Sequence, residues 1–332
     1  MPQRDLRALP KAHLHLHLEG GMRPATLLEL ADHYGVAVTM DGDGSFETFI
    51  RLYRAACEVL RSPDDVARLV REVAEDAAAA GGVWVEPSEW ITAAQASRLQ
   101  LNNEEAVLEV VLDAARRAER DTGVGVGIMV ASNRTRPPDE AVALARLAAR
   151  YADQGVVAFG LADDELRGVP ELFAEGFRIA RDAGIIRAPH AGEHGGPESV
   201  RGALDALGAQ RIQHGVRSAE DPWLLERLAA EEVTLDVCPT SNVQLKLFPD
   251  YASHPLPKLL QAGVKVSLNA DDPLFFGSGL LEEYELARNT FGLDDEALAS
   301  IAASSIRASG APDALKATAL KGIERWRTAP AS

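Results

Sequence analysis

The segment from Lys11 to Glu19, with the sequence KAHLHLHLE, constrains the fold more than any other part of the chain. Histidine and leucine alternate in it with a period of two, which is typical of a β-strand. In a strand, His13, His15 and His17 lie on one face and the leucines on the other. If this strand lines a closed barrel, the histidines point inward, and a pair two residues apart is a natural half of a zinc site. The alternative is an edge strand with three solvated histidines.

Short apolar runs followed by helical patterns recur along the chain, and this alternation predicts βα units around a parallel sheet. Eight such runs predict an α/β fold, a (β/α)8 TIM barrel of the metal-dependent hydrolase type. Barrels of this kind reach the length of this chain as one domain, so residues 1–332 are expected to form a single catalytic domain. The expected strands span residues 12–18, 83–86, 124–131, 156–160, 185–190, 211–213, 233–238 and 265–269.

The connection after the first strand is longer than a barrel crossover needs. It contains helical patterns at residues 24–34 and 45–60, and Ser62-Pro63-Asp64-Asp65 then begins a further helix that ends at Gly81-Gly82. We expect residues 21–82 to form a helical insertion over the mouth of the barrel, where substrate walls lie. A structural elaboration without a role at the site is the equal alternative.

Composition argues against several classes of partner. A net charge of −16 repels phosphate backbones and anionic lipids, so we expect no nucleic-acid partner and no membrane partner. No run approaches the roughly 20 apolar residues that span a bilayer, and the first residues lack the apolar core of a signal peptide. The two cysteines, Cys57 and Cys238, form no disulfide framework. These features predict a cytoplasmic protein, and nothing in the sequence indicates an oligomeric state.

Polar residues gather after the expected strands, at the end of the barrel where enzymes of this fold place their active sites. They include three histidines and one aspartate, a suitable ligand set for a single Zn²⁺ that keeps a position open for water. These predicted ligands are His15, His17, His190 and Asp271.

Three further residues are candidates for proton chemistry beside such a metal. His214, which follows the sixth strand, could orient or deprotonate a water molecule. Glu193, three residues after a predicted ligand, could carry a proton to the substrate, and Asp272 could hydrogen-bond a ring nitrogen. Two other histidines, His33 and His254, are assigned to the surface.

The chain resembles the adenosine deaminase family of zinc-dependent purine aminohydrolases over nearly its whole length. The matching motifs, in the family's order, are His15-Leu16-His17-Leu18-Glu19-Gly20, His190-Ala191-Gly192-Glu193, His214-Gly215, Cys238-Pro239-Thr240-Ser241-Asn242, Ser267-Leu268-Asn269-Ala270-Asp271-Asp272-Pro273 and Ser305-Ile306-Arg307-Ala308-Ser309.

The resemblance implies one Zn²⁺ per chain on the four predicted ligands, and a catalytic set of Glu193, His214 and Asp271. In that scheme Glu193 protonates purine N1 while water adds at C6. His214 positions the water and stabilises developing charge, and Asp272 hydrogen-bonds N7. Protonation of N1 makes C6 electrophilic, which favours the addition. Loss of ammonia then yields the 6-oxo purine.

Two departures from the family's usual pattern bear on the substrate. Glu19 replaces an aspartate that lies near the ribose in adenosine-specific members, and Asp163 replaces a glycine after the fourth strand. Glu19, Asp163 and Asp272 are therefore the expected substrate-binding residues. The expected function is hydrolytic deamination of a 6-aminopurine nucleoside, either adenosine or 6-aminodeoxyfutalosine, with free adenine as the alternative.

Two other classes of function compete with this prediction. A binuclear amidohydrolase commonly needs a carboxylated lysine or a bridging glutamate near the end of the fourth strand, but Ala158-Phe159-Gly160 offers no lysine. One metal is therefore preferred. A non-catalytic ligand-binding barrel is the other possibility, since fold does not fix function. That class would be free to lose ligands or the proton donor, and every expected position is filled.

Overall fold

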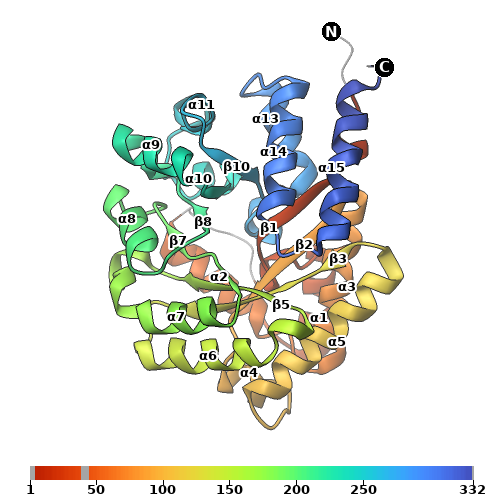
Figure 1. Ribbon diagram of the computed structural model, residues 1–332. Coiled ribbons are helices and arrows are strands. Elements are labelled where there is room, and N and C mark those ends of the chain that lie inside the picture. Colours follow the sequence, from red (N-terminus) through yellow and green to blue (C-terminus); the bar gives the residue numbers. More distant parts are fainter. Residues whose placement is uncertain (1–3, 39–44, 331–332) are drawn as a thin grey trace.

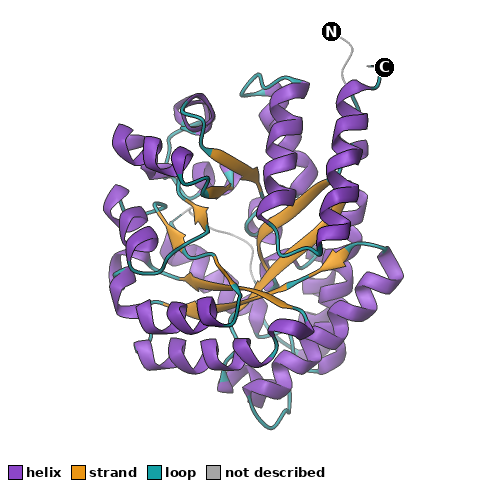
Figure 2. Ribbon diagram, viewed as in Figure 1, coloured by secondary structure: helices purple, strands orange, loops and turns teal. Residues whose placement is uncertain are grey.

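A ring of parallel strands forms the centre of the molecule, and helices surround it (Figure 2). The structure, a computed structural model, describes residues 4–38 and 45–330. The strands within these ranges are β1 (Lys11–His17), β2 (Gly82–Glu89), β3 (Gly125–Val126), β4 (Ile128–Asn133), β5 (Val156–Ala162), β6 (Ile186–Arg187), β7 (His190–Ala191), β8 (Arg211–His214), β9 (Thr234–Val237) and β10 (Lys265–Leu268).

The strand segments form two sheets that join into one barrel. One sheet has the order β1-β2-β4-β5-β6 with β3 also on β2, and the other has the order β10-β9-β8-β7. Between β6 and β7, Ala188 N–H donates to β5 and the Pro189 carbonyl accepts from β8, so these two segments act as one strand. A parallel bridge between Leu16 and Asp271 closes the ring. The (β/α)8 barrel predicted from the sequence is confirmed.

The helices cover the outside of this barrel, and the chain ends lie side by side (Figure 1). Near the ends, Trp326 Nε1 donates to the Asp5 carbonyl at 2.7 Å, and the Arg4 guanidinium donates to the Ala329 carbonyl. The helices are α1 (Pro24–Tyr34), α2 (Phe46–Cys57), α3 (Pro63–Ala79), α4 (Ala93–Arg98), α5 (Glu104–Thr122), α6 (Pro138–Arg150), α7 (Ala174–Asp182), α8 (Pro197–Asp205), α9 (Pro222–Ala230), α10 (Pro239–Gln244), α11 (Leu256–Gln261), α12 (Pro273–Phe276), α13 (Leu280–Asn289), α14 (Asp295–Ala308) and α15 (Asp313–Thr328).

Helices α1, α2 and α3 occupy the long connection after β1. Helix α3 begins after Ser62, as expected, where Ser62 and Asp65 form a capping box, and it packs against β2 and α5, as a barrel crossover helix does. Helix α2 instead directs aromatic rings to the barrel mouth, where Phe49 stacks on Phe276. Residues 39–44 of the expected insertion lie outside the described residues, and an insertion spanning 21–82 stays a prediction.

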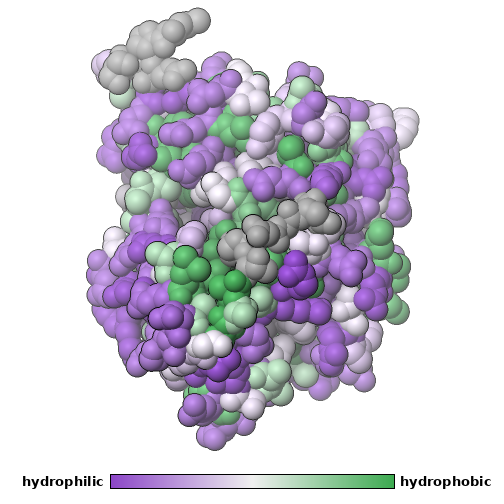
Figure 3. All heavy atoms as spheres, turned by 180° about the vertical axis from the view of Figure 1, so that it is seen from behind, coloured by the Kyte–Doolittle hydropathy of each residue, from purple (hydrophilic) through white to green (hydrophobic). Residues whose placement is uncertain are grey.

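Figure 3 shows the face opposite to that in Figure 1, where apolar residues gather near the middle of a largely polar surface. Among the described residues, no helix combines the length and apolar character that a membrane span requires.

A buried ion cluster occupies the barrel interior below the mouth. Arg211 of β8 lies 2.6 Å from a carboxylate oxygen of Glu86 on β2 and 2.7 Å from one of Asp236 on β9. All three side chains are fully buried. Trp84 Nε1 also donates to Glu86, at 2.8 Å. Because two buried carboxylates share one guanidinium, loss of the arginine leaves uncompensated negative charge.

We predict that Arg211→Met lowers the free energy of unfolding by about 3–5 kcal/mol, the cost of breaking a buried ion pair by removal of one partner. The matched control is Arg178→Met, which removes an exposed arginine paired with Glu175 and Asp182. That change should cost no more than about 1 kcal/mol. Urea unfolding at pH 7 measures both. Equal losses in the two variants would contradict the prediction.

A second buried carboxyl, Glu283 on α13, makes stability depend on pH. Its oxygens accept hydrogen bonds from Ser278 Oγ at 2.6 Å and from the Thr240 N–H at 3.3 Å. Burial raises the pKa of Glu283 to about 7, whereas an unfolded glutamate has a pKa of about 4.3. Between these values the folded chain holds a proton that the unfolded chain has lost. Stability from this group is therefore complete below pH ~4.3 and is lost as pH rises through about 7.

The substitution Glu283→Gln, which mimics the protonated acid, should remove this pH dependence. We expect the stability of the variant relative to wild type to increase from pH 5 to about pH 7, by up to about 1.4 kcal/mol per pH unit, and to level off above the pKa of Glu283. Thermal unfolding across this range measures the difference. The control Glu282→Gln changes the neighbouring exposed carboxylate and should show no such trend. A pH-independent difference for Glu283→Gln would contradict the prediction.

Candidate metal centre and active site

Three of the predicted site residues lie in a strained backbone conformation. Asp163, His214 and Asp271 have φ angles of 77°, 63° and 61°, in the left-handed region that residues other than glycine rarely adopt. Each lies at or just after the end of a strand, β5, β8 and β10 respectively. Such conformations persist only where the surrounding structure enforces them, and they concentrate at functional sites. Gln100, Glu232 and Lys246 share this conformation and are not predicted site residues, so the strain supports the site only together with the residue types.

Two imidazole rings face each other with unprotonated nitrogens. His15 Nδ1 lies 3.1 Å from the Asp236 carbonyl, and His190 Nδ1 lies 3.1 Å from the Leu161 carbonyl. Since a carbonyl only accepts, each Nδ1 carries the proton and each Nε2 carries a lone pair. The two Nε2 atoms are only 3.2 Å apart. Two lone pairs at this distance repel each other unless they share a cation, so the geometry fits a bound metal ion.

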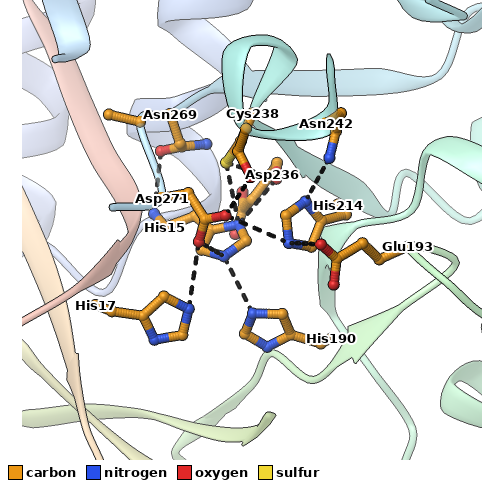
Figure 4. A network of polar contacts seen from close by, with 12 residues as sticks. His15, His17, His190, Glu193, His214, Asp236, Cys238, Asn242, Asn269 and Asp271 are labelled. Atoms are coloured by element: carbon orange, nitrogen blue, oxygen red, sulfur yellow. Dashed lines mark hydrogen bonds and ion pairs between the residues drawn. The ribbon is translucent and has the colours of Figure 1, made fainter. Parts of the chain in front are cut away.

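His17 and Asp271, the other two predicted ligands, lie beside this pair of rings (Figure 4). One carboxylate oxygen of Asp271 lies 3.2 Å from His15 Nε2 and 3.3 Å from His17 Nε2. Among the described residues, ligand atoms of His15, His190, His214 and Asp271 all lie within 4.8 Å of one another. The site thus brings together all four residues predicted as ligands, with His214 beside them. Nitrogen and carboxylate donors in this number suit Zn²⁺.

Glu193 and His214 lie beside this cluster and line the cavity next to it. His214 Nε2 is 3.6 Å from a Glu193 carboxylate oxygen and 3.9 Å from the second oxygen of Asp271. Burial, with the charge of Asp271 next, raises the pKa of Glu193 well above its ordinary range. Burial likewise lowers the pKa of His214 well below 6.5. A protonated carboxyl and a neutral imidazole are what proton delivery beside a metal requires.

Asp272 offers two buried carboxylate oxygens with no hydrogen-bond partner among the described residues. Burial and the adjacent Asp271 raise its pKa well above the ordinary value of 3.8. Gly20 makes room for it, because a Cβ on Gly20 would lie 1.8 Å from an Asp272 oxygen. Asp272 also lines the cavity above the cluster. An unpaired acid in this place is available to a polar atom of a ligand.

The other two predicted substrate residues line the same cavity, whose volume is about 1010 Å³. Glu19 is buried and accepts a 2.6 Å hydrogen bond from the hydroxyl of Tyr53 on α2. Asp163 accepts from Asn133 Nδ2 at 2.6 Å and from its neighbour's N–H at 2.7 Å. Tyr53 and Phe49 of α2 line this cavity.

Several residues with no role predicted from the sequence hold the site in place. Ser241 Oγ donates to Asp271 at 2.6 Å, and the Asn269 side-chain oxygen accepts the N–H groups of Leu14 and His15. Both residues lie inside motifs that match the family, but a motif does not show which groups these two side chains contact. The assignment of His254 to the surface is wrong. Its side chain is buried because Phe248 and Phe291 pack around the ring.

Glu165 clamps the turn that carries Glu193. Its carboxylate accepts three backbone N–H groups, from Gly192 at 2.5 Å, Glu193 at 2.9 Å and Gly195 at 2.7 Å. Glu165 is itself buried and lies shortly after the end of β5. Both carboxylate oxygens of Glu165 are used, one by the N–H of Gly192 and the other by the N–H groups of Glu193 and Gly195. These three bonds fix the position of the backbone from which the Glu193 side chain extends.

Comparison with known proteins agrees with this geometry. Residues 10–326 match the sequence model of the adenosine deaminase family. A putative adenosine/adenine deaminase of Streptomyces virginiae is 48% identical and aligns over 98% of both chains. The crystal structure of adenine deaminase from Arthrobacter aurescens superposes with a TM-score of 0.88 at 33% identity, covering 97% of this chain and 100% of that one. A Zn-bound amidohydrolase from Burkholderia ambifaria superposes with a TM-score of 0.85 at 27% identity, covering 98% and 97%.

We predict that Glu165→Gln lowers kcat roughly 10–100-fold, the usual effect of removing a group that orients an active-site side chain. The amide keeps one acceptor but turns an N–H toward backbone N–H groups, so the turn shifts. Steady-state kinetics on the metal-loaded protein measure the loss. Glu171→Gln, at an exposed position in the short 3-10 helix Pro170–Phe173, is the matched control and should leave kcat unchanged. Wild-type turnover in a folded Glu165→Gln protein would contradict the prediction.

Proposed function

Because this chain belongs to the adenosine deaminase family of metal-dependent purine deaminases, we propose that its substrate is free adenine. The reaction would be hydrolytic deamination to hypoxanthine with release of ammonia. The sequence alone put adenosine and 6-aminodeoxyfutalosine ahead of adenine, and the relatives favour adenine instead. The Streptomyces protein is named for both activities, and the Arthrobacter structure for adenine deaminase.

The observation that carries the choice of adenine is the buried carboxylate of Glu19. It lines the cavity together with His17 and Asp272, and it accepts a hydrogen bond from the hydroxyl of Tyr53. Free adenine carries an N–H on its imidazole ring, and a nucleoside has a sugar in that place. A buried carboxylate is a strong acceptor for such an N–H, because hydrogen bonds to charged groups are the stronger ones. The longer side chain of Glu19 thus suits a free base.

The proposed chemistry uses the residues around the metal cluster. Glu193, kept protonated by burial, would donate to N1 of the ring and make C6 electrophilic. Asp272, whose pKa burial also raises, would donate to N7. His214 would contact the oxygen that adds to C6. A bound Zn²⁺ supplies a water molecule of lowered pKa at neutral pH. The proton that the water loses on adding to C6 would pass to the amino nitrogen, and the C6–amino bond would then break, so that water and adenine give hypoxanthine and ammonia.

We propose four residues as the ligands of one Zn²⁺ per chain: His15, His17, His190 and Asp271. The facing Nε2 atoms of His15 and His190 support this assignment. A cytoplasmic location also stays a proposal, supported by the acidic composition and the two free cysteines.

A purine nucleoside is the second candidate, and the size of the cavity favours it. Its volume of about 1010 Å³ lies at the upper end of the roughly 300–1,000 Å³ typical of small-molecule sites. The cavity continues past Tyr53 to Glu105 on α5 and Arg150 on α6. An adenine ring leaves this outer part unfilled, whereas a sugar or a larger substituent would extend into it.

The test is ammonia release by the zinc-loaded protein with adenine, adenosine and 6-aminodeoxyfutalosine measured side by side. We expect kcat/KM to be highest for adenine, by about tenfold or more, the value of one good charged hydrogen bond. Glu19→Asp retracts the carboxylate and should lower kcat/KM for adenine more than for adenosine. A higher kcat/KM for either nucleoside in wild type would replace adenine as the substrate.

The role of Glu193 is tested by Glu193→Gln, which keeps the shape of the side chain and removes the acid. We expect this variant to bind one equivalent of zinc and to lose about 10²–10⁴-fold in kcat. Metal analysis and ammonia release give the two values. Near-normal turnover would remove Glu193 as the proton donor. Absence of ammonia from all three substrates, with zinc bound to wild type, would refute purine deamination itself.

A further inference from the structure

A series of hydrogen-bonded side chains leads from His214 to His254, a buried histidine just before α11. His214 Nδ1 lies 3.1 Å from Asn242 Nδ2, as Figure 4 shows. The amide oxygen of Asn242 lies 3.1 Å from His254 Nε2. His254 Nδ1 in turn receives the backbone N–H of Leu256 at 3.2 Å. Asn242 and His254 are both buried, and neither is a predicted metal ligand.

The direction of every hydrogen bond in this series follows from its last member. The N–H of Leu256 can only donate, so His254 Nδ1 must carry a lone pair. Burial lowers the pKa of His254 to about 3, which keeps the ring neutral. A neutral ring without a proton on Nδ1 has it on Nε2, and His254 therefore donates to the oxygen of Asn242.

The tautomer of His214 is set in the same way by Asn242. With its oxygen engaged by His254, Asn242 presents its NH₂ group to His214 Nδ1. An amide nitrogen only donates, so His214 Nδ1 accepts. Since Nδ1 carries no proton, the ring proton of His214 lies on Nε2. That nitrogen faces the space between Glu193 and Asp271, where the reacting oxygen of a deamination would lie.

We propose that Asn242 and His254 are positioning residues that hold His214 in the tautomer with its proton on Nε2. His214 then donates a hydrogen bond to the oxygen that adds to the purine and does not take a proton from it. The sequence left both roles open. The opposite tautomer would point two N–H groups at each other across 3.1 Å, between His214 Nδ1 and Asn242. This inference rests on the proposed deamination only for the identity of the reacting oxygen.

The direct test is NMR of zinc-loaded protein in which the histidine rings carry ¹⁵N. Two-bond ¹H–¹⁵N correlations distinguish protonated from unprotonated ring nitrogens, and the signals missing in His214→Gln assign those of His214. We expect Nε2 to carry the proton and Nδ1 to be free at pH 7. A proton on Nδ1, or on both nitrogens, would overturn the proposal. Because no substrate is present, this result does not depend on the proposed function.

The variant Asn242→Asp should reverse the tautomer, since a carboxylate oxygen accepts from His214 Nδ1. We expect the proton of His214 to move to Nδ1 and kcat for adenine to fall about 10²–10³-fold, with KM changed less than about threefold, as for loss of one donor at a reacting oxygen. Asn289→Asp adds the same charge at an exposed position and is the control. An unchanged tautomer in Asn242→Asp would overturn the proposal.

His254 supplies a second, conservative pair of variants. Gln at position 254 keeps an N–H donor for the Asn242 oxygen, whereas Leu keeps the packing against Phe248 and Phe291 and removes the donor. We expect His254→Gln to retain the wild-type tautomer and His254→Leu to give a mixture of tautomers with lower kcat. Equal behaviour of the two variants would overturn the role of His254. The expected tautomers with no adenine turnover would instead refute only the proposed function.

Discussion

The backbone bridge between Leu16 and Asp271 is the interaction on which both the barrel and the site depend. The His17 N–H donates to the Asp271 carbonyl at 3.0 Å, and the Asp271 N–H donates to the His15 carbonyl at 3.1 Å. These two bonds join the first strand to the segment after the last one. They close the barrel and also place the Asp271 carboxylate beside both histidine rings. The same contact therefore completes the fold and gathers the ligands.

Below this bridge, polar contacts replace the apolar filling usual in such barrels. Asn269 accepts the backbone N–H of His15 and donates to Ser267, Ser267 donates to Asp236, and Asp236 pairs with Arg211. The Asp236 carbonyl also fixes the tautomer of His15. A fully connected buried network is rigid, whereas a partly satisfied one is costly. The network thus links the stability of the barrel interior to the orientation of one ring at the metal centre.

Much of the fold and of the site could be predicted because local patterns carry them. Alternation in the first strand, capping at Ser62 and the recurrence of βα units indicated the barrel, and the histidines at strand ends indicated the metal cluster. The prediction for His254 was wrong because a lone histidine between prolines in a polar segment gives no sign of the phenylalanines that enclose it. Glu165 and Asn242 received no role, since each acts on a group far along the chain.

The sequence by itself determined the architecture, the residues that meet at the barrel mouth and the class of chemistry they support. These follow from periodicity and from motif order, which are properties of short segments. Only the tertiary structure decided which nitrogen of each histidine carries a proton, which acid lacks a partner, and that Tyr53 of α2 holds Glu19. Such properties depend on contacts between segments distant in sequence. A tautomer is set by whether the neighbour donates or accepts, and no pattern within one strand encodes that neighbour.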